Sequence, residues 1–241
     1  MKHVLIMGAS GDIGASIAKL LAEDGWSLYL HANTQMNRVD RLVREFSEAY
    51  TDQEFFGYQL DMTEEDKIGF FVEGIFSLDG VVFANGYTDY NLLDQLSSQA
   101  MDDMWKVHVK TPVRLIQLLQ EKLSKSSQGR IVFISSVYAE YGSAMEVFYS
   151  TTKGAQVSFV KAYSKEVASL GITVNAVLPG AIETKMNQQL TVSEREELTQ
   201  NIPLGRMGDP LDISFWVKQL LQKESGYLTG QAITISGGWP I

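Results

Sequence analysis

The sequence has no cysteine, few histidines and no long apolar run, and each absence excludes a class of site or protein. Without cysteine there is neither a disulfide framework nor a thiolate metal site. The three histidines, His3, His31 and His108, are far apart in the chain, which argues against a histidine-rich metal site. No stretch approaches the roughly 18 apolar residues of a membrane-spanning helix. We therefore predict no metal site and no membrane span.

Positive charge is also scarce. The chain has 20 Lys and Arg against 29 Asp and Glu, a formal net charge of −9, which argues against nucleic-acid binding although a local basic patch is compatible with it. The apolar run at residues 4–7 is too short for a signal peptide, and Gly8 interrupts it. These features together predict a cytoplasmic protein.

The chain has 241 residues and is 45% hydrophobic, which suits one α/β domain of the larger kind. Strand-like apolar runs alternate with helical stretches. We expect strands at 4–7, 27–30, 55–60, 78–83, 130–134, 172–177 and 232–235. We expect helices at 13–24, 35–50, after a cap at Thr63, and at 99–124, 146–169 and 210–222.

Such alternation implies a parallel sheet with helices on both faces and right-handed crossovers. The predicted fold class is α/β, a single-domain, Rossmann-type doubly wound parallel sheet of about seven strands that covers residues 1–241. The polar segment 185–208 is predicted to form a mobile lid over the substrate.

Three glycines follow the first predicted strand. Gly8, Gly11 and Gly14 have the spacing G-x-x-G-x-x-G directly after the strand, where a helix opens. Glycine permits a tight turn and close backbone approach, and a helix N-terminus presents bare N–H groups to a pyrophosphate. The pattern predicts a dinucleotide site. The alternative is a tight βα turn that binds no ligand.

The end of the second strand bears on the choice of cofactor. NAD-selective sites usually have a carboxylate there, but residues 30–38, L-H-A-N-T-Q-M-N-R, contain none. NADP(H) is therefore favoured over NAD(H), with Asn33 and Thr34 as candidate phosphate contacts and Arg38 beyond them. Asp61 ends the third strand, where its carboxylate would accept from an adenine amino group or simply form a turn.

Tyr149 and Lys153 are four residues apart on a predicted helix, so their side chains share one face. An ammonium beside a phenol favours the phenolate and lowers a pKa that is about 10 when unperturbed. A tyrosine of this kind exchanges a proton with a carbonyl oxygen near neutral pH. The alternative interpretation of the pair is a solvated helix face.

These motifs occur with others in a fixed order along the chain. In addition to the glycine turn, they are L60-D-M62, N85-G86, I134-S-S136, Y149-x-x-x-K153, V174-N-A-V-L-P-G180 with I182-E-T184, and T229-G-Q followed by S236-G-G238. In this order they resemble the short-chain dehydrogenase/reductase family over essentially all 241 residues. The resemblance implies an NAD(P)-dependent oxidoreductase, commonly a tetramer or dimer, and we expect a homotetramer.

The resemblance also implies roles for individual residues. Tyr149 is the general acid in reduction, Ser136 hydrogen-bonds the carbonyl oxygen, and Lys153 lowers the pKa of Tyr149 and holds the nicotinamide ribose. Hydride passes from the cofactor to the carbonyl carbon. The cofactor-binding residues implied in this way are Gly8, Ser10, Gly11, Asp12, Ile13, Gly14, Asn33, Thr34, Asp61, Met62, Asn85, Gly86, Tyr149, Lys153, Pro179, Gly180, Ile182 and Thr184.

The chain departs from the family pattern in the cofactor region. Asp12 stands where many members have the middle glycine, and Gly11 stands where NADP-dependent members often have Arg or Lys. One support for the NADP prediction is therefore missing. Ala84 replaces the Asn that normally braces the fourth strand.

A further departure places His108 where the family has a catalytic Asn on the long helix. Pro112 has no N–H, so it cannot bond the carbonyl of residue 108, four positions back. In the family a backbone carbonyl there holds a water that is linked to the lysine. We predict that the carbonyl of His108 serves this proton-relay water and that its imidazole is secondary. The alternative is a kink without a role.

Two groups of relatives point to different substrates. The runs R130-I-V-F-I-S-S136 and L170-G-I-T-V-N-A-V-L-P-G180 resemble the 3-oxoacyl-[acyl-carrier-protein] reductases. Those enzymes usually present arginines to the acidic carrier beside the active site, where this chain has Leu170 and Ser127. With a net charge of −9, docking of an acidic carrier looks poor.

A more specific resemblance lies in S27-L-Y-L-H31, in the run from Gly142 to Gln156 and in T184-K-M-N187. These resemble the reductases that act on the 5-aminopentanone-modified lysine of elongation factor P in some Gram-positive bacteria. Such a substrate carries an amine, and Glu146, one helical turn before Tyr149, is suitably placed to attract it. The alternative for Glu146 is an acid favoured by the dipole at a helix start.

The first hypothesis is therefore an NADPH-dependent ketone reductase that acts on modified elongation factor P. The second is a 3-oxoacyl-[acyl-carrier-protein] reductase in fatty acid synthesis. The third is a catalytically idle, cofactor-binding sensor or scaffold, and the intact Ser136, Tyr149 and Lys153 count against it. The sequence leaves the physiological direction of the reaction open.

Overall fold

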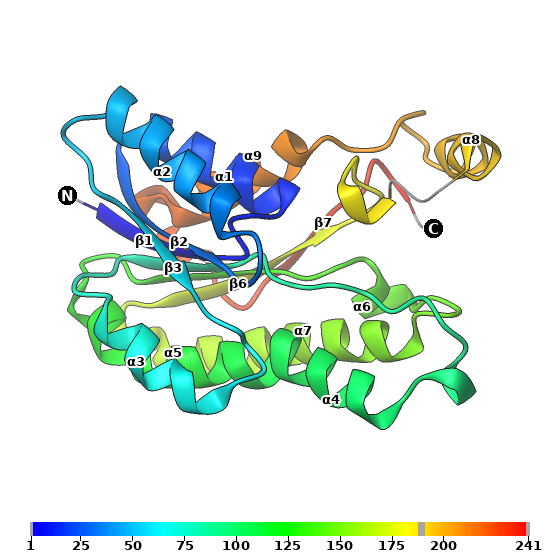
Figure 1. The fold of residues 1–241 in the computed structure, drawn as a ribbon, viewed down its shortest axis with the longest axis horizontal. Coiled ribbons are helices and arrows are strands. Elements are labelled where there is room, and N and C mark those ends of the chain that lie inside the picture. Colours follow the sequence, from blue (N-terminus) through cyan, green and yellow to red (C-terminus); the bar gives the residue numbers. More distant parts are fainter. Residues whose placement is uncertain (1, 188–190, 240–241) are drawn as a thin grey trace.

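A computed structural model describes residues 2–187 and 191–239, so residues 188–190 of the predicted lid lie outside the described residues. Seven strands form one parallel sheet in the order β3-β2-β1-β4-β5-β6-β7 (Figure 1). The strands are β1 (Lys2–Met7), β2 (Trp26–Ala32), β3 (Phe55–Gln59), β4 (Gly80–Phe83), β5 (Arg130–Ile134), β6 (Thr173–Pro179) and β7 (Ala232–Ile235). The doubly wound sheet predicted from the alternation of strands and helices is confirmed.

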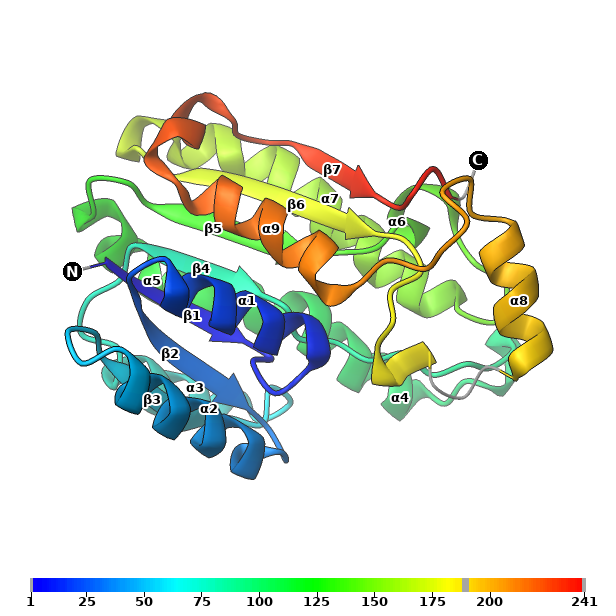
Figure 2. The ribbon, with the colours of Figure 1, turned by 90° about the horizontal axis from the view of Figure 1, so that it is seen from above.

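Helices cover both faces of the sheet (Figure 1). One face carries α1 (Asp12–Glu23), α2 (Met36–Ala49) and α9 (Pro210–Leu221). The other carries α3 (Ile68–Glu73), α4 (Ser98–Trp105), α5 (Thr111–Lys125) and α7 (Val147–Val167). Seen from above, α1 and α9 lie side by side over the middle of the sheet (Figure 2).

Shorter helices complete the described chain. Two of them, α6 (Tyr138–Tyr141) and α8 (Val192–Gln200), are not predicted by the sequence. Single turns of 3₁₀-helix occur at Glu65–Lys67, Leu93–Gln95, Ala168–Leu170, Lys185–Asn187 and Lys223–Tyr227. The start of the predicted lid is thus a 3₁₀ turn, and its later part contains α8.

Strand β1 shows why the sheet is buried on both sides. Val4 and Ile6 point to the core beneath α1, α2 and α9, whereas Leu5 and Met7 point to the core beneath α5 and α7. All four side chains are fully buried. A strand covered on both faces needs a continuous apolar run, and this strand has one.

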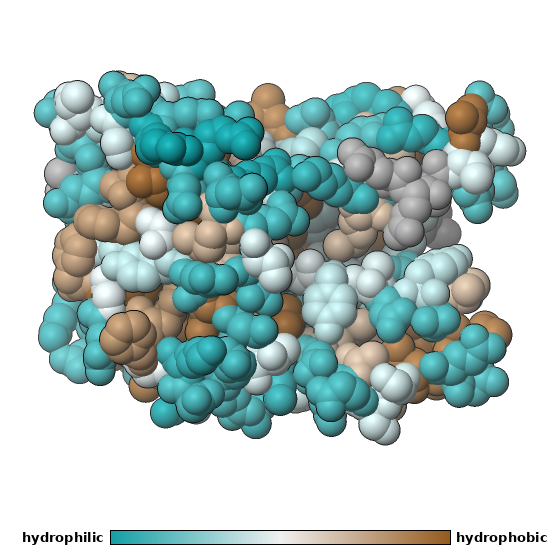
Figure 3. Space-filling view, in the orientation of Figure 1, coloured by the Kyte–Doolittle hydropathy of each residue, from teal (hydrophilic) through white to brown (hydrophobic). Residues whose placement is uncertain are grey.

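The outer surface differs from this core. The face in Figure 3 is mainly hydrophilic over the helices, with smaller hydrophobic areas between them. In the part of the chain that the structure describes, no helix is long and apolar enough to cross a membrane.

The glycine turn links β1 to α1 at the point where the sheet order changes direction. Gly8 has φ +78, a conformation that favours glycine, and a Cβ there would lie 2.8 Å from Ala84 O and from the backbone of Asn85. A Cβ on Gly14 would lie 2.2 Å from Gly8 O. The turn is therefore packed between the helix and the end of β4, at the switch point where ligands bind in open α/β sheets.

The predicted cap at Thr63 is wrong. Asp61 Oδ1 accepts from both the Thr63 N–H at 2.9 Å and the Thr63 hydroxyl at 2.7 Å, so the two residues form a turn. The helical segment starts later, at the 3₁₀ turn Glu65–Lys67, without a side-chain cap. Asp61 thus forms a turn, and its contact with an adenine amino group stays a prediction.

Candidate active site

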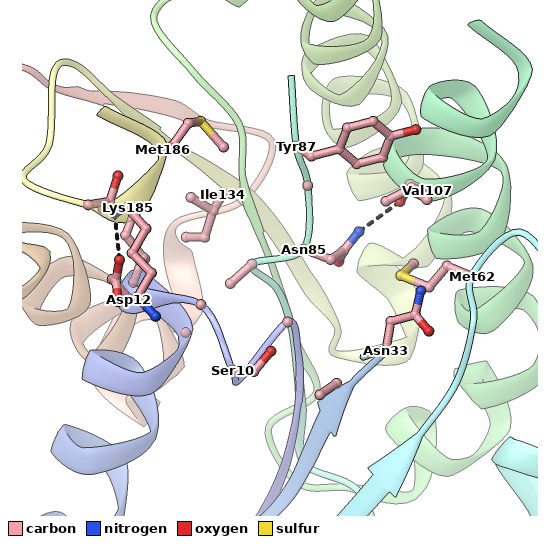
Figure 4. Close-up of a pocket in the computed structure, with 18 of the residues that line it drawn as sticks. Ser10, Asp12, Asn33, Met62, Asn85, Tyr87, Val107, Ile134, Lys185 and Met186 are labelled. Carbon is pink, nitrogen blue, oxygen red and sulfur yellow. Dashed lines mark hydrogen bonds between the residues drawn. The ribbon is translucent and has the colours of Figure 1, made fainter. Parts of the chain in front are cut away.

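A cavity of about 740 Å³ lies at the carboxyl ends of the strands. Its lining comes from the segments after β1, β2, β3, β4, β5 and β6 and from α4, α7 and the turn at 184–187 (Figure 4). Ser136 and all the residues that the family resemblance implies for the cofactor line it: Gly8, Ser10, Gly11, Asp12, Ile13, Gly14, Asn33, Thr34, Asp61, Met62, Asn85, Gly86, Tyr149, Lys153, Pro179, Gly180, Ile182 and Thr184. Two candidates, His108 and Glu146, are not part of the lining.

A buried histidine that sequence reasoning missed holds the glycine turn in place. His31 Nδ1 accepts from the Gly8 N–H at 3.0 Å, and its Nε2–H donates to Leu60 O at 2.9 Å. Burial lowers the pKa of His31 to about 4, so the ring is neutral and keeps this pattern at neutral pH. It ties the ends of three strand segments together. A lone histidine at the end of an apolar strand gives no signal of this role.

Asp12 and Arg38 lie together at the adenosine end suggested by Asn33 and Thr34. Arg38 Nη2 donates to Asp12 Oδ1 at 2.9 Å, and Asp12 Oδ2 accepts from the Lys185 N–H at 2.8 Å (Figure 4). Burial raises the pKa of Asp12, but the hydrogen bonds from Lys185 and Arg38 outweigh it and hold the pKa below its usual value. The carboxylate that replaces the family's glycine is therefore ionised and joins two segments of the cavity wall.

Ser136, Tyr149 and Lys153 meet at the other end of the cavity. Ser136 is 7% exposed, Tyr149 9% and Lys153 3%, so the three polar groups face little solvent. Lys153 Nζ donates to Ile134 O at 2.9 Å and lies 5.4 Å from the centre of the Tyr149 ring. The structure thus brings together three residues that are separated by up to seventeen positions in the sequence.

The pKa of Tyr149 is shifted in the direction opposite to the one the sequence predicts. Burial raises it, and the negative charge of Glu146 raises it further, while a hydrogen bond with the Ser136 hydroxyl acts against both. Lys153 does not lower it, because its ammonium is directed to the Ile134 carbonyl and its own pKa falls to about 7 on burial. In this arrangement Tyr149 keeps its proton at neutral pH, as a general acid must.

The buried Lys153 has a consequence for stability. Its pKa is about 7 when folded and 10.5 when free, so between these pH values the unfolded chain binds more protons and stability rises with pH. We expect Lys153→Met to be more stable than the wild type at pH 6, by on the order of 2 kcal/mol. This difference in the free energy of unfolding between Lys153→Met and the wild type should shrink as the pH approaches 9.5. Urea unfolding at both pH values measures it.

The exposed Lys161 on the same helix provides the control. Lys161→Met should change the free energy of unfolding little at either pH. A Lys153→Met advantage that stays constant or grows from pH 6 to pH 9.5 would contradict the account.

The predicted long helix exists, but it contains a π-helical segment, Lys106–Lys110, between α4 and α5. His108 lies in this segment and its side chain is completely buried. Its Nδ1 lies 2.8 Å from Thr152 Oγ1, whose hydroxyl donates to Tyr149 O, so Nδ1 carries the proton. Its Nε2 accepts from the Tyr87 N–H at 3.2 Å.

Burial lowers the pKa of His108 well below 6.5, so the ring is neutral with both nitrogens in use. The carbonyl of His108 accepts from Gln156 Nε2 at 2.8 Å. Gln156 therefore supplies the donor that Pro112 cannot. The carbonyl's role in a proton relay stays a prediction.

Glu146 precedes α7 and lies near Tyr149 without lining the cavity. Its carboxylate accepts from the Thr88 hydroxyl at 2.7 Å and from the Ser143 hydroxyl at 3.3 Å. Its charge acts on Tyr149, as the raised pKa of that residue indicates. These contacts hold the Glu146 carboxylate one helical turn before Tyr149.

The expectation about the carrier-docking positions needs correction. Ser127 precedes β5 and Leu170 precedes β6, so both lie at the amino ends of the strands. The cavity lies at the carboxyl ends, so neither position flanks the active site of its own chain. Their lack of charge therefore says nothing about docking beside this cavity within one chain.

The sequence of the chain is similar to those of known oxidoreductases. The family model described as short chain dehydrogenase matches residues 2–195. An uncharacterized oxidoreductase of Bacillus subtilis (strain 168), YmfI, is 38% identical over 240 residues, which cover 99% of this chain and 98% of that protein. A 3-oxoacyl-[acyl-carrier-protein] reductase, FabG, of Staphylococcus aureus (strain Mu50) is 32% identical over 98% of this chain and 97% of that protein.

Solved structures of reductases and related proteins have the same fold as this chain. A blue fluorescent protein from a metagenomic library, in complex with NADPH, matches with a TM-score of 0.91 and 26% identity, over 100% of this chain and 98% of that one. The NADPH-dependent reductase YwfH, involved in bacilysin biosynthesis, matches with a TM-score of 0.92 over 100% of this chain and 99% of that one. Its 21% identity supports the shared fold.

Proposed function

The chain belongs to the short-chain dehydrogenase family of oxidoreductases, and from this premise we propose that it is an NADPH-dependent ketone reductase. The observation that carries the proposal is the single cavity in which the glycine turn meets Ser136, Tyr149 and Lys153. A cofactor site and a proton donor that share one cavity suit hydride transfer to a carbonyl group.

The cavity fits a dinucleotide. The glycine turn leaves a cradle that side chains would fill, and Gly11 precedes α1 without a side-chain cap, so the N–H groups of the first turn are open to a pyrophosphate. Residues 33–38 carry no carboxylate, and Arg38 lines the cavity beside Asn33 and Thr34, which favours a 2′-phosphate. NADPH, when bound, supplies the hydride. The solved relative in complex with NADPH supports this choice.

The remaining chemistry falls to the chain's own residues. The protonated Tyr149 hydroxyl donates a proton to the carbonyl oxygen, and the Ser136 hydroxyl donates a hydrogen bond to the same oxygen. Lys153, which lines the same cavity, is positioned to hold a ribose. Burial of all three excludes water and strengthens each interaction.

For the substrate, we favour the 5-aminopentanone group on a modified lysine of elongation factor P. The support is the fixed negative charge of Glu146 next to Tyr149, which suits a substrate that carries an amine. A 3-oxoacyl group on acyl carrier protein is the second candidate, favoured by the similarity to the Staphylococcus aureus reductase. We further propose a homotetramer, to be tested by light scattering.

Glu146→Gln separates these candidates. Loss of the charge should raise KM for the amino-ketone substrate about tenfold, as expected for a charge-assisted contact, and should change KM for a β-ketoacyl thioester by less than about twofold. The assay follows NADPH oxidation at 340 nm with both substrates. Glu140→Gln, which removes an exposed carboxylate from the neighbouring helix α6, is the control.

Unchanged kinetics of Glu146→Gln with the amino-ketone would refute the role of Glu146. Turnover of the thioester alone would favour the acyl carrier substrate. Tight NADPH binding with no turnover of any ketone would point to a sensor or scaffold.

A further inference from the structure

A short tail, residues 236–239, follows β7 and runs beside the loop after α8 (Figure 2). Residues 201–207 of that loop belong to the predicted lid and are called the lid loop below. Gly237 O accepts from the Leu204 N–H at 3.1 Å. A Cβ built on Gly237 would lie 3.0 Å from Ile202 Cγ2, so the tail and the lid loop are in close contact.

The lid has few apolar contacts of its own. α8 buries none of its side chains, and Ile202 and Met207 are the two buried side chains of the lid loop. Together with Ala181 they form a small cluster that is separate from the two main cores. A segment with so little buried apolar surface opens locally at a low cost in free energy unless another element holds it.

Trp239 supplies such a contact. Its half-buried ring packs on one side against the cluster of Ile202 and Met207, where Leu198 from α8 also packs. On the other side the ring meets Tyr138 of α6 edge-on, with 5.9 Å between the ring centroids and 66° between the planes. One side chain thereby joins the lid loop and the end of α8 to α6.

Tyr138 connects this contact to the active site. It lies two residues after Ser136, and its N–H donates to Ser136 Oγ at 3.2 Å. Burial raises the pKa of Tyr138, and the nearby charge of Glu146 raises it further, so the phenol lies close to the Glu146 carboxylate. Neither Tyr138 nor Trp239 lines the cavity, so Trp239 acts through the residues that it contacts.

The start of the tail is fixed to the wall of the cavity. Gly180 lines the cavity, and its N–H donates to Ile235 O at 3.0 Å. A Cβ built on Gly180 would lie 2.8 Å from both Cα and Cβ of Ser236. Because the backbone before Trp239 is packed in this way, its ring extends from a rigid support.

Resting on the proposed ketone reductase function, we propose that Trp239 is a positioning residue for the ketone. It holds the lid loop and the end of α8 against Tyr138, so that the lid keeps its place beside the active site. Ser136, Tyr149 and Lys153 come from the end of β5 and from α7, outside the lid. Trp239 therefore acts on ketone binding and leaves the chemical step unchanged.

Trp239→Ala tests the proposal by steady-state kinetics at saturating NADPH, with the amino-ketone or the β-ketoacyl thioester, whichever the wild type reduces. KM for the ketone should rise about tenfold, since an aromatic contact that holds the lid is lost. The kcat should change by less than about twofold. Trp239→Phe keeps a ring to pack on Tyr138 and should restore KM to within about threefold of the wild-type value.

Trp216→Ala is the matched control. Trp216 is an exposed tryptophan of α9 that packs edge-on against Phe215, at 5.4 Å between the ring centroids, and it lies outside the lid. Its variant should keep both KM and kcat within about twofold of the wild-type values.

Limited digestion with trypsin measures the opening of the lid without any ketone. Arg195 lies in α8, and Lys161 lies in the long helix α7. Trp239→Ala should be cut after Arg195 about tenfold faster than the wild type, because the lid opens more often. Cleavage after Lys161 should keep the wild-type rate, since α7 is not held by Trp239.

Either an unchanged KM or an unchanged rate of cleavage after Arg195 would overturn the proposal. Equal acceleration of cleavage after Arg195 and Lys161 would overturn it as well, because the whole chain would then be destabilised. If Trp239→Ala does not fold, Trp239→Leu carries the same expectations. Absence of ketone turnover by the wild type would overturn the proposed function, and the digestion would then still decide whether Trp239 holds the lid.

Discussion

Tyr149→Phe should lower the rate of ketone reduction at saturating NADPH by about a thousandfold, within the range of general acid catalysis. The substitution removes the hydroxyl but keeps the ring, which is buried and packs edge-on against His108 at 5.6 Å between centroids. The variant should therefore fold as the wild type does, and its NADPH affinity should change by no more than about threefold. Stopped-flow oxidation of NADPH measures the chemical step.

Tyr141→Phe is the control for this experiment. Tyr141 is exposed and lies outside the cavity, although it is only eight residues away in the sequence. Its variant should keep the wild-type rate within about twofold. A Tyr149→Phe enzyme that retained a tenth or more of the wild-type rate would show that another group supplies the proton.

Gly14→Ala should have the largest effect on stability. The added methyl group would lie 2.2 Å from Gly8 O and 2.9 Å from Gly8 C, both of them backbone atoms that cannot turn aside. We expect a loss of about 3 kcal/mol or more in the free energy of unfolding, or failure to accumulate as folded protein. Urea unfolding of the purified variant is the measurement.

Gly69→Ala provides the comparison within the same chain. Gly69 lies in α3, and no atom lies within 4 Å of a Cβ built on it. Alanine there should stabilise the protein by about 0.5–1 kcal/mol, because glycine loses more conformational freedom in a helix. Equal midpoints for Gly14→Ala and the wild type would mean that the close packing of the turn is not as described.

The fold could be predicted because its signals are local. Seven apolar runs of strand length alternate with helical segments, and a strand that is covered on both faces needs a near-continuous apolar run, as residues 4–7 of β1 show. The two missed helices lack that signal. α6 spans four residues, and α8 buries none of its side chains, so no apolar periodicity marks either.

The site could be predicted where spacing along the chain determines proximity. The glycine turn and the four-residue interval from Tyr149 to Lys153 need only one turn or one helix. Contacts between distant segments gave no such signal. His31 on Gly8 and Gln156 on His108 join residues 23 and 48 positions apart, and neither contact follows from a local pattern.

Electrostatics was the least predictable feature. The spacing of Tyr149 and Lys153 suggested a lowered tyrosine pKa, but burial and Glu146 raise it. A helix pattern shows that two side chains share a face, yet it does not show how deeply they are buried or that Lys153 Nζ bonds Ile134 O instead. Similarly, Pro112 in the sequence indicates that the His108 carbonyl loses its helical donor. It does not indicate that the Gln156 side chain replaces that donor.

The central claim is that one cavity holds NADPH and reduces a ketone with the proton of Tyr149. The most direct test follows the label from NADPH deuterated at the transferable position of the nicotinamide ring. Wild-type protein is incubated with an amino-ketone substrate or a β-ketoacyl thioester, and the mass of the alcohol product is measured by mass spectrometry. We expect an alcohol that carries one deuterium on the former carbonyl carbon, and about a thousandfold less of it in the same time with Tyr149→Phe. No labelled alcohol from either ketone, in a protein that binds NADPH, would contradict the account.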